Sequence, residues 1–110
     1  DNYFIQGRIL NQLERYEEAL EYYNKIISEL DSKSGEAYYH KGDTLFLLNR
    51  YEEALECYDQ AIMLNIEEFG LYYHKGLTLI ELKIYEEEAI EAFEIALKLV
   101  PNDADSYLKL

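Results

Sequence analysis

The chain of 110 residues repeats one sequence pattern three times. Each copy opens with a tyrosine-led segment that ends in glycine, at residues 3–7, 38–42 and 72–76. A Tyr-Glu-Glu segment that leads to alanine and a further aliphatic residue follows, at residues 16–20, 51–55 and 85–90. The glycines Gly7, Gly42 and Gly76 are 35 and 34 residues apart. A period near 34 residues that contains two helix-length patterns predicts a stack of helix pairs, an all-α solenoid.

Within each copy the apolar residues follow helical spacing. Gly42 and Leu45 lie on one side of a first helix, and Ala54 and Tyr58 lie on one side of a second helix. Only residues 49–50 separate the two patterns, which predicts a tight antiparallel turn. A glycine in the middle of a helix costs about 1 kcal/mol relative to alanine, so its presence indicates a close helix contact. We expect the small Ala54 to be the partner of Gly42.

Local chemistry predicts where the helices begin and end. Ser34 and Asp103 are suitable N-caps for the helices that follow them, and Pro101 must follow the end of the preceding helix. Boundaries predicted in this way are good to about 2–4 residues. The predicted helices span residues 2–13, 17–30, 36–48, 52–65, 70–82, 86–99 and 104–110.

The repeated motifs resemble the tetratricopeptide repeat (TPR) family. The resemblance rests on the Tyr-x-x-x-Gly-x-x-Leu and Tyr-Glu-Glu-Ala-Leu-Glu-x-Tyr segments and on Pro101, and it covers essentially the whole chain. It implies a right-handed superhelical solenoid of antiparallel helix pairs in one domain, residues 1–110. The repeats would span about residues 1–34, 35–68 and 69–103, with a partial repeat at 104–110. The chain starts and stops inside this pattern, so we expect a fragment with three repeats and the start of a fourth. Departures from the family are modest: it usually has an apolar residue where this chain has Gln6, Lys41 and Lys75.

Two of the repeats contain one extra residue each, and the fold must accommodate both. From Tyr16 to Tyr38 the chain advances 22 residues, but from Tyr51 to Tyr72 it advances only 21. We expect the polar connector at residues 31–34 to hold the extra residue. The third repeat has one extra glutamate before Ala89. An insertion inside the helix would rotate the apolar stripe by about 100°, and the stripe is preserved. We therefore expect the turn between Tyr85 and Ala89 to absorb the extra residue.

The balance of charge limits the partners. The chain has 10 basic and 23 acidic residues and a net charge of −13. Because nucleic acids and anionic lipid surfaces bind through Lys and Arg, neither is expected as a partner. The charge indicates a solvated outer face, with an acidic surface for a basic partner as the alternative. No run approaches 18 apolar residues, so no membrane span is predicted. The single cysteine, Cys57, fits a reducing compartment and a cytoplasmic location.

The resemblance places the functional face on the concave surface formed by the first helix of each repeat. In the second repeat, the side opposite the glycine stripe carries Tyr, Phe and Leu, which a purely solvated face would not. Tyr39, Leu47 and Tyr73 have two interpretations, groove or core shared between repeats. Phe46, Leu77 and Ile80 are expected to be the most open. The candidate groove residues are Phe4, Ile5, Arg8, Asn11, Tyr39, His40, Asp43, Phe46, Leu47, Tyr73, His74, Leu77 and Ile80.

Three functions are compatible with such a face. The first is a protein–protein interaction scaffold whose groove receives a helical or extended peptide with apolar anchors. The alternative is a structural element that stacks on other copies or on other domains of its parent chain, including weak self-association through the truncated ends. The third is a small-molecule pocket lined by Tyr39, His40, Tyr73 and His74. Whether the groove is open or occupied distinguishes the first two.

No catalytic, cofactor or metal site is expected. The sequence lacks a glycine-rich phosphate loop and a Ser/His/Asp arrangement. His40 and His74 occupy matching places, but helices packed about 8–10 Å apart do not let them share an ion, so groove or packing histidines are expected. Cys57 lies among acidic residues, which disfavours a thiolate. One subset of the family grips the carboxylate of chaperone tails with Lys, Asn and Arg. The matching places here hold Phe4, Arg8, His40, Gly70 and His74, so that function is not expected.

Overall fold

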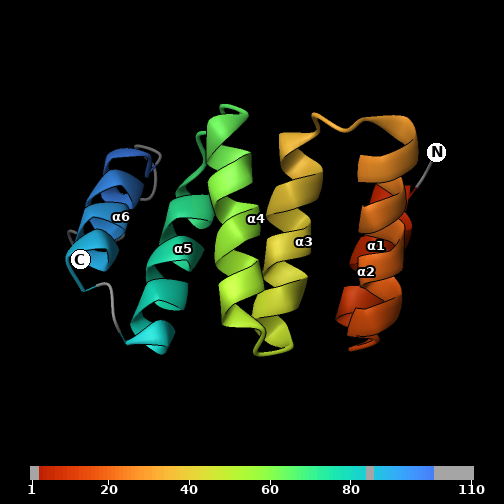
Figure 1. The fold of residues 1–110 in the computed structure, drawn as a ribbon, viewed down its shortest axis with the longest axis horizontal. Coiled ribbons are helices and arrows are strands. Elements are labelled where there is room, and N and C mark those ends of the chain that lie inside the picture. The colour runs from red at the N-terminus through yellow and green to blue at the C-terminus, as the bar shows by residue number, and fades with distance from the viewer. Residues whose placement is uncertain (1–2, 84–85, 101–110) are drawn as a thin grey trace. The chain divides into compact units, whose positions relative to one another are not determined.

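The computed structural model describes residues 3–83 and 86–100, and these are helical apart from the connections. No strand occurs in these two stretches. The chain divides into two compact units, residues 1–66 and 67–110. Unit 1 contains α1 (Tyr3–Gln12), α2 (Tyr16–Lys25), a π-helical turn η1 (Ile26–Leu30), α3 (Gly35–Leu47) and α4 (Tyr51–Met63) (Figure 1). Unit 2 contains α5 (Phe69–Leu82) and α6 (Glu86–Lys98).

Consecutive helices pack as pairs. α1 packs on α2, α3 on α4 and α5 on α6, and within unit 1 α2 also packs on α3 (Figure 1). The all-α fold of repeated helix pairs predicted from the period is therefore confirmed, and each described helix begins and ends within two residues of its predicted bounds, once η1 is counted with α2. The predicted helix at 104–110, its cap at Asp103 and the stop at Pro101 lie outside the described residues. None of the described helices is long and apolar enough to cross a bilayer.

The ends of the helices follow the local chemistry of the chain. Ser34 caps α3 as predicted, because its hydroxyl accepts a hydrogen bond from the Ala37 N–H at 3.1 Å. The turn inside each repeat uses a left-handed residue at one repeat position: Glu14, Asn49 and Lys83 have φ values of 60°, 63° and 62°. A left-handed residue is a common way to end a helix, and it redirects the chain into the second helix of the pair.

Each repeat glycine faces an aromatic ring of the second helix. A Cβ atom added to Gly42 would lie 2.8 Å from the Tyr58 ring. The equivalent atom would lie 2.7 Å from Tyr23 at Gly7 and 2.6 Å from Phe93 at Gly76. The prediction of a close helix contact at Gly42 is confirmed. The expected partner was wrong: the atoms nearest to a side chain at Gly42 belong to Tyr58 and Cys57 and not to Ala54. A tyrosine ring extends farther from its helix than the methyl group of an alanine.

The core of each unit is built from small residues and large rings. In unit 1 the buried residues Ala19, Tyr23 and Ile26 of α2 and η1 pack with Ala37 of α3, so the first two repeats share one core. Within the second repeat Leu45, Ala54, Tyr58 and Ala61 are buried. In unit 2 the buried face of α6 carries Ala89, Ala92 and Ala96.

The extra residue between the first two repeats is accommodated in the connector that precedes α3. The Asp31 N–H donates to the Ile26 carbonyl, as the Ile66 N–H donates to the Ala61 carbonyl at the same repeat position. From Asp31 to Gly35, the first residue of α3, is four positions, whereas from Ile66 to Phe69, the first residue of α5, is three. The first extra residue therefore lies in residues 31–34, as predicted. Ala89 is the fourth residue of α6, as Ala54 is of α4. Glu86, Glu87 and Glu88 therefore belong to α6 and not to the turn that was expected to absorb the second extra residue, and residues 84–85 lie outside the described residues.

Candidate functional site

Some predicted groove residues of α1 are exposed, and others contact the second repeat. Ile5 and Arg8 are exposed, and together with Ile9 and Gln12 they line a hollow of about 240 Å³. Asn11 faces the second repeat instead, and its Oδ1 accepts a hydrogen bond from the Thr44 hydroxyl at 3.1 Å. Because Thr44 is fully buried, this hydrogen bond ties α1 to α3.

A cluster of rings occupies the junction between the first two repeats. The His40 ring stacks on Tyr23 at 5.8 Å and on Tyr39 at 5.4 Å, and Phe4 meets it edge-on at 5.8 Å. Tyr39 also contacts the Tyr58 ring. Phe4 and His40 are half-buried and their rings serve the packing between the first two repeats. Tyr39 is also half-buried, but its ring contacts lie within the second repeat.

Further along α3 the predicted residues differ in how open they are. The Tyr58 hydroxyl donates a hydrogen bond of 2.6 Å to Asp43 Oδ1. Phe46 was expected on an open surface, but it is half-buried and its ring meets Tyr51 edge-on at 5.4 Å. Leu47 is the open residue of this group, with half of its surface exposed. An apolar anchor on α3 is therefore more accessible at Leu47 than at Phe46.

The first helix of unit 2 presents an aromatic and aliphatic surface. Tyr73 is 40% exposed and stacks on the exposed Phe69 with ring centroids 5.5 Å apart. Tyr73 also contacts Phe93 of α6, at 5.8 Å. Ile80 is half-exposed as expected, whereas His74 and Leu77 are half-buried. Unit 2 thus combines open apolar side chains with a ring pair that can receive another flat or apolar group.

One contact in the repeat was missed in the sequence analysis. The residue directly after the repeat glycine lies next to the aromatic ring that faces this glycine. Asp43 binds the Tyr58 hydroxyl, and the same positions hold Leu77 and Phe93 in the third repeat, where both members are apolar. Part of the signal was available, because the tyrosine becomes phenylalanine in the same repeat in which the residue after the glycine becomes leucine. Burial strongly raises the pKa of Tyr58, and the nearby Asp43 carboxylate raises it further, so this phenol stays a hydrogen-bond donor.

The first repeat has the same pairing without the hydrogen bond. Tyr23 faces Gly7, and its hydroxyl is buried with no hydrogen-bond partner among the described residues. Burial raises the pKa of Tyr23 to about 12, while the positive charge of Arg8 lowers it and the Asp43 carboxylate raises it. Arg8 therefore influences this phenol through its charge, whereas Asp43 binds Tyr58 directly.

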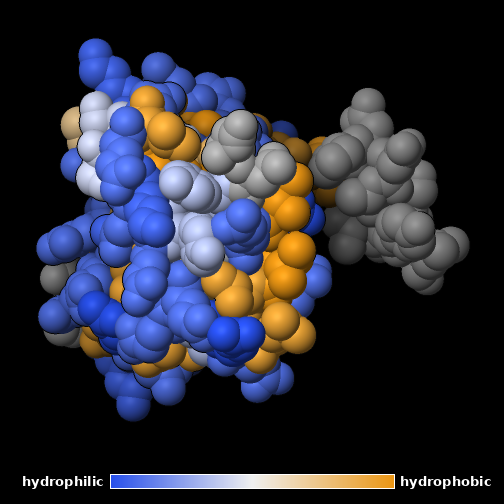
Figure 2. All heavy atoms as spheres, turned by 90° about the vertical axis from the view of Figure 1, so that its right-hand side faces the viewer, coloured by the Kyte–Doolittle hydropathy of each residue, from blue (hydrophilic) through white to orange (hydrophobic). Residues whose placement is uncertain are grey.

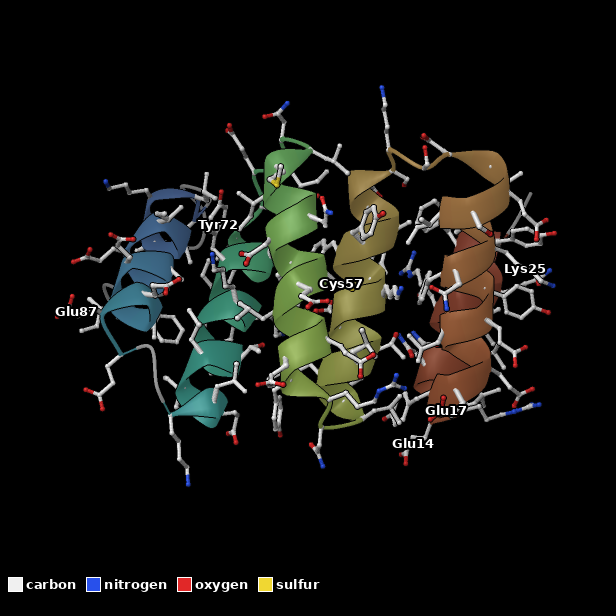
Figure 3. The ribbon with its side chains drawn as sticks, in the orientation of Figure 1. Glu14, Glu17, Lys25, Cys57, Tyr72 and Glu87 are labelled. Atoms are coloured by element: carbon white, nitrogen blue, oxygen red, sulfur yellow. The ribbon has the colours of Figure 1, made fainter. Side chains whose placement is uncertain are left out.

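Cys57 lies on α4 beside α3 (Figure 3). It is buried, and burial is the main cause that raises the pKa of its thiol to about 11. The acidic neighbours Glu53 and Glu56 add to this shift, and Lys41 opposes it. A thiolate is disfavoured as predicted, although the main reason is desolvation. In the described stretches no three His, Cys, Asp or Glu residues are grouped so that they could hold a metal ion.

The chain is similar in sequence and in fold to known proteins. Family models described as tetratricopeptide repeat match residues 1–29 and 35–66, together more than half of the chain. No curated protein sequence matches the chain.

Solved structures match over most of the chain. The structure of YrrB, described as a TPR protein with an unusual peptide-binding site, superposes with a TM-score of 0.82 and 29% identity over 94% of this chain. MamA superposes with a TM-score of 0.78 and 29% identity over 86% of this chain. The second TPR of Spaghetti (RPAP3), bound to an HSP90 peptide, has a TM-score of 0.84 at 24% identity over 90% of both chains.

The match to the RPAP3 domain shows the fold. The chain spans about half of the YrrB and MamA chains that it matches, 52% and 54% respectively. The matched family models, the repeat glycines that face aromatic rings and the paired helices agree with one another. The chain belongs to the tetratricopeptide repeat family.

Proposed function

We propose that the chain is a protein-interaction module that binds a peptide or helix of a partner protein over the first helices of its repeats. The observation that carries the proposal is the set of open apolar side chains on these helices. Leu47 on α3 is half-exposed, and Tyr73 and Ile80 on α5 are 40% and 50% exposed. YrrB, which is 29% identical to this chain, is described as having a peptide-binding site.

The chemistry of these helices favours a peptide with apolar anchors. Open apolar side chains bind a partner by removing their surface from water, and a few well-buried anchors supply most of the binding energy. Arg8, which is exposed on α1, provides a positive charge that can orient the ligand. Because the net charge is −13, segments that flank the anchors should be neutral or basic.

The proposal is tested with a peptide selected from a displayed library against the full chain. Its affinity is measured by calorimetry for the wild type and for the Leu47→Ser and Tyr73→Ser variants. Each variant should bind about 5–30-fold more weakly, since loss of one apolar anchor costs about 1–2 kcal/mol. Circular dichroism should show unchanged helix content, because neither side chain belongs to the buried core.

Met63→Ser is the matched control. Met63 is 75% exposed on α4, a second helix, and should not contribute to binding. If the peptide binds both first-helix variants as tightly as the wild type, the proposed surface is wrong. Weakening by Met63→Ser alone would place the binding surface on the second helices.

A further inference from the structure

An apolar stripe runs along the open side of α1. Ile5, Ile9 and Leu13 follow each other at four-residue intervals and are 53%, 50% and 59% exposed. Ile9 lines two hollows, the one of about 240 Å³ described above and one of about 330 Å³ that Leu13 and Tyr22 also line. Figure 2 views the α1–α2 end and shows hydrophobic residues gathered along one side of it. The proposed peptide-binding residues do not account for this stripe as a whole.

The second repeat shows what such a stripe does. The positions of Ile5 and Ile9 correspond to His40 and Thr44 on α3, counted from the repeat glycines. Thr44 is fully buried and donates to Asn11 of the first repeat, and His40 lies against Tyr23 of that repeat. On α3, therefore, this stripe is the face on which the preceding helix pair packs.

The third repeat carries the complementary side of that junction. Asn11 and Phe4, which meet α3 from the first repeat, correspond to Ile80 and Tyr73 on α5. Ile80 is 50% exposed and Tyr73 is 40% exposed. Tyr73 contacts Phe93, which occupies the position of Tyr23 in the first repeat. Unit 2 thus exposes the residues that would receive another stripe of the α1 kind.

The two open faces also match in polarity. Inside unit 1 the junction pairs two polar groups, Thr44 and Asn11. The corresponding pair between the open faces would be Ile9 and Ile80, both apolar. A polar side chain on either face would bury an unpaired polar group in such a contact, whereas two isoleucines bury apolar surface only.

From this match we propose that the α1 stripe of one copy docks on the α5–α6 face of a second copy, in continuation of the junction between the first two repeats. The docking face shares Tyr73 and Ile80 with the proposed peptide-binding surface, so a bound peptide and a second copy would compete for it. The contact joins two different surfaces, so it is head-to-tail, and further copies add to either end. Repulsion between chains of charge −13 opposes the contact, and salt screens that repulsion.

Sedimentation equilibrium over a wide range of protein concentration, at low and high salt, tests the proposal. The wild type should gain mass with concentration, and more strongly at high salt. Ile9→Glu and Ile80→Glu should each remain monomeric, since each puts a charge into an apolar contact. Met63→Glu adds the same charge at an exposed position outside both faces and should associate like the wild type. Circular dichroism checks folding, and Ile9→Ser and Ile80→Ser are milder substitutes for any variant that does not fold.

Mixing the two variants tests the head-to-tail geometry. The Ile9→Glu chain keeps an intact α5–α6 face, and the Ile80→Glu chain keeps an intact α1 stripe. The mixture should therefore form a one-to-one complex and nothing larger. A wild type that stays monomeric throughout, association of either variant alone, or a mixture without a complex would each overturn the proposal.

Discussion

At the scale of single residues, two repeats bury a tyrosine ring against the repeat glycine, and they differ in whether the tyrosine hydroxyl has a hydrogen-bond acceptor. Tyr58 donates to Asp43 at 2.6 Å, whereas the Tyr23 hydroxyl is buried without a hydrogen-bond partner among the described residues. Both rings are completely buried and both face a glycine. The two phenols therefore differ mainly in whether the hydroxyl is satisfied.

This difference predicts opposite results for one substitution. Tyr58→Phe should lower the free energy of unfolding by about 1–3 kcal/mol, because a charge-assisted hydrogen bond is lost. Tyr23→Phe should leave it unchanged or raise it by up to about 1 kcal/mol, because a buried unsatisfied hydroxyl is removed. Urea unfolding of both variants measures the effect. Equal losses in the two variants would show that the Tyr23 hydroxyl has a partner as good as Asp43.

At the scale of helices, the pair α3–α4 depends on close approach at Gly42. The Tyr58 ring fills the space that a side chain on Gly42 would need, and Cys57 approaches the same point. α3 can approach α4 closely because Gly42 has no side chain. The low helix propensity of glycine is the cost of this close approach.

Gly42→Leu should lower the free energy of unfolding by about 1–3 kcal/mol, because overpacking outweighs the better helix propensity of leucine. Thermal unfolding followed by circular dichroism measures the change. Asn24→Leu, at an exposed position of α2, is the control for propensity and should not destabilise the chain. Unchanged or higher stability of Gly42→Leu would mean that the two helices separate at little cost.

At the scale of the whole molecule, titration of buried groups predicts lability at high pH. The pKa of Cys57 rises from 9.0 to about 11 and that of Tyr23 from 10.0 to about 12 in the folded chain, mainly because both are buried. The folded state therefore holds these protons more tightly than the unfolded state. Their contribution to stability is complete below pH 9 and is lost as the pH rises through the folded pKa values.

The free energy of unfolding should accordingly fall between about pH 9 and 11, by at most about 1.4 kcal/mol per pH unit for each group. Urea unfolding across this range measures the slope. Cys57→Ala should have a lower stability at neutral pH but a shallower slope between pH 9 and 11. The same slope in wild type and variant would show that the thiol does not contribute.

The fold was predictable from the sequence because its signals are local and occur three times. The spacing of glycines and alanines identifies the helix pairs, and Ser34 marks the start of α3. The open apolar surface was predictable in part: Ile80 is open as expected, whereas Phe46 rests on Tyr51 and Leu77 is half-buried. Helical periodicity says which side of a helix a residue occupies, but a ring from the neighbouring helix decides whether that side is covered.

The sequence by itself determined the all-α class, the helix bounds, the paired packing and the place of the extra residue near Asp31, because each follows from periodicity, capping and turn chemistry along the chain. Only the tertiary structure decided that Gly42 meets the Tyr58 ring, that Asn11 and His40 serve the junction between the first two repeats, and that the Ile5 stripe stays open. These outcomes depend on the reach and orientation of side chains between helices, and long rings and amides reach partners that residue spacing does not specify.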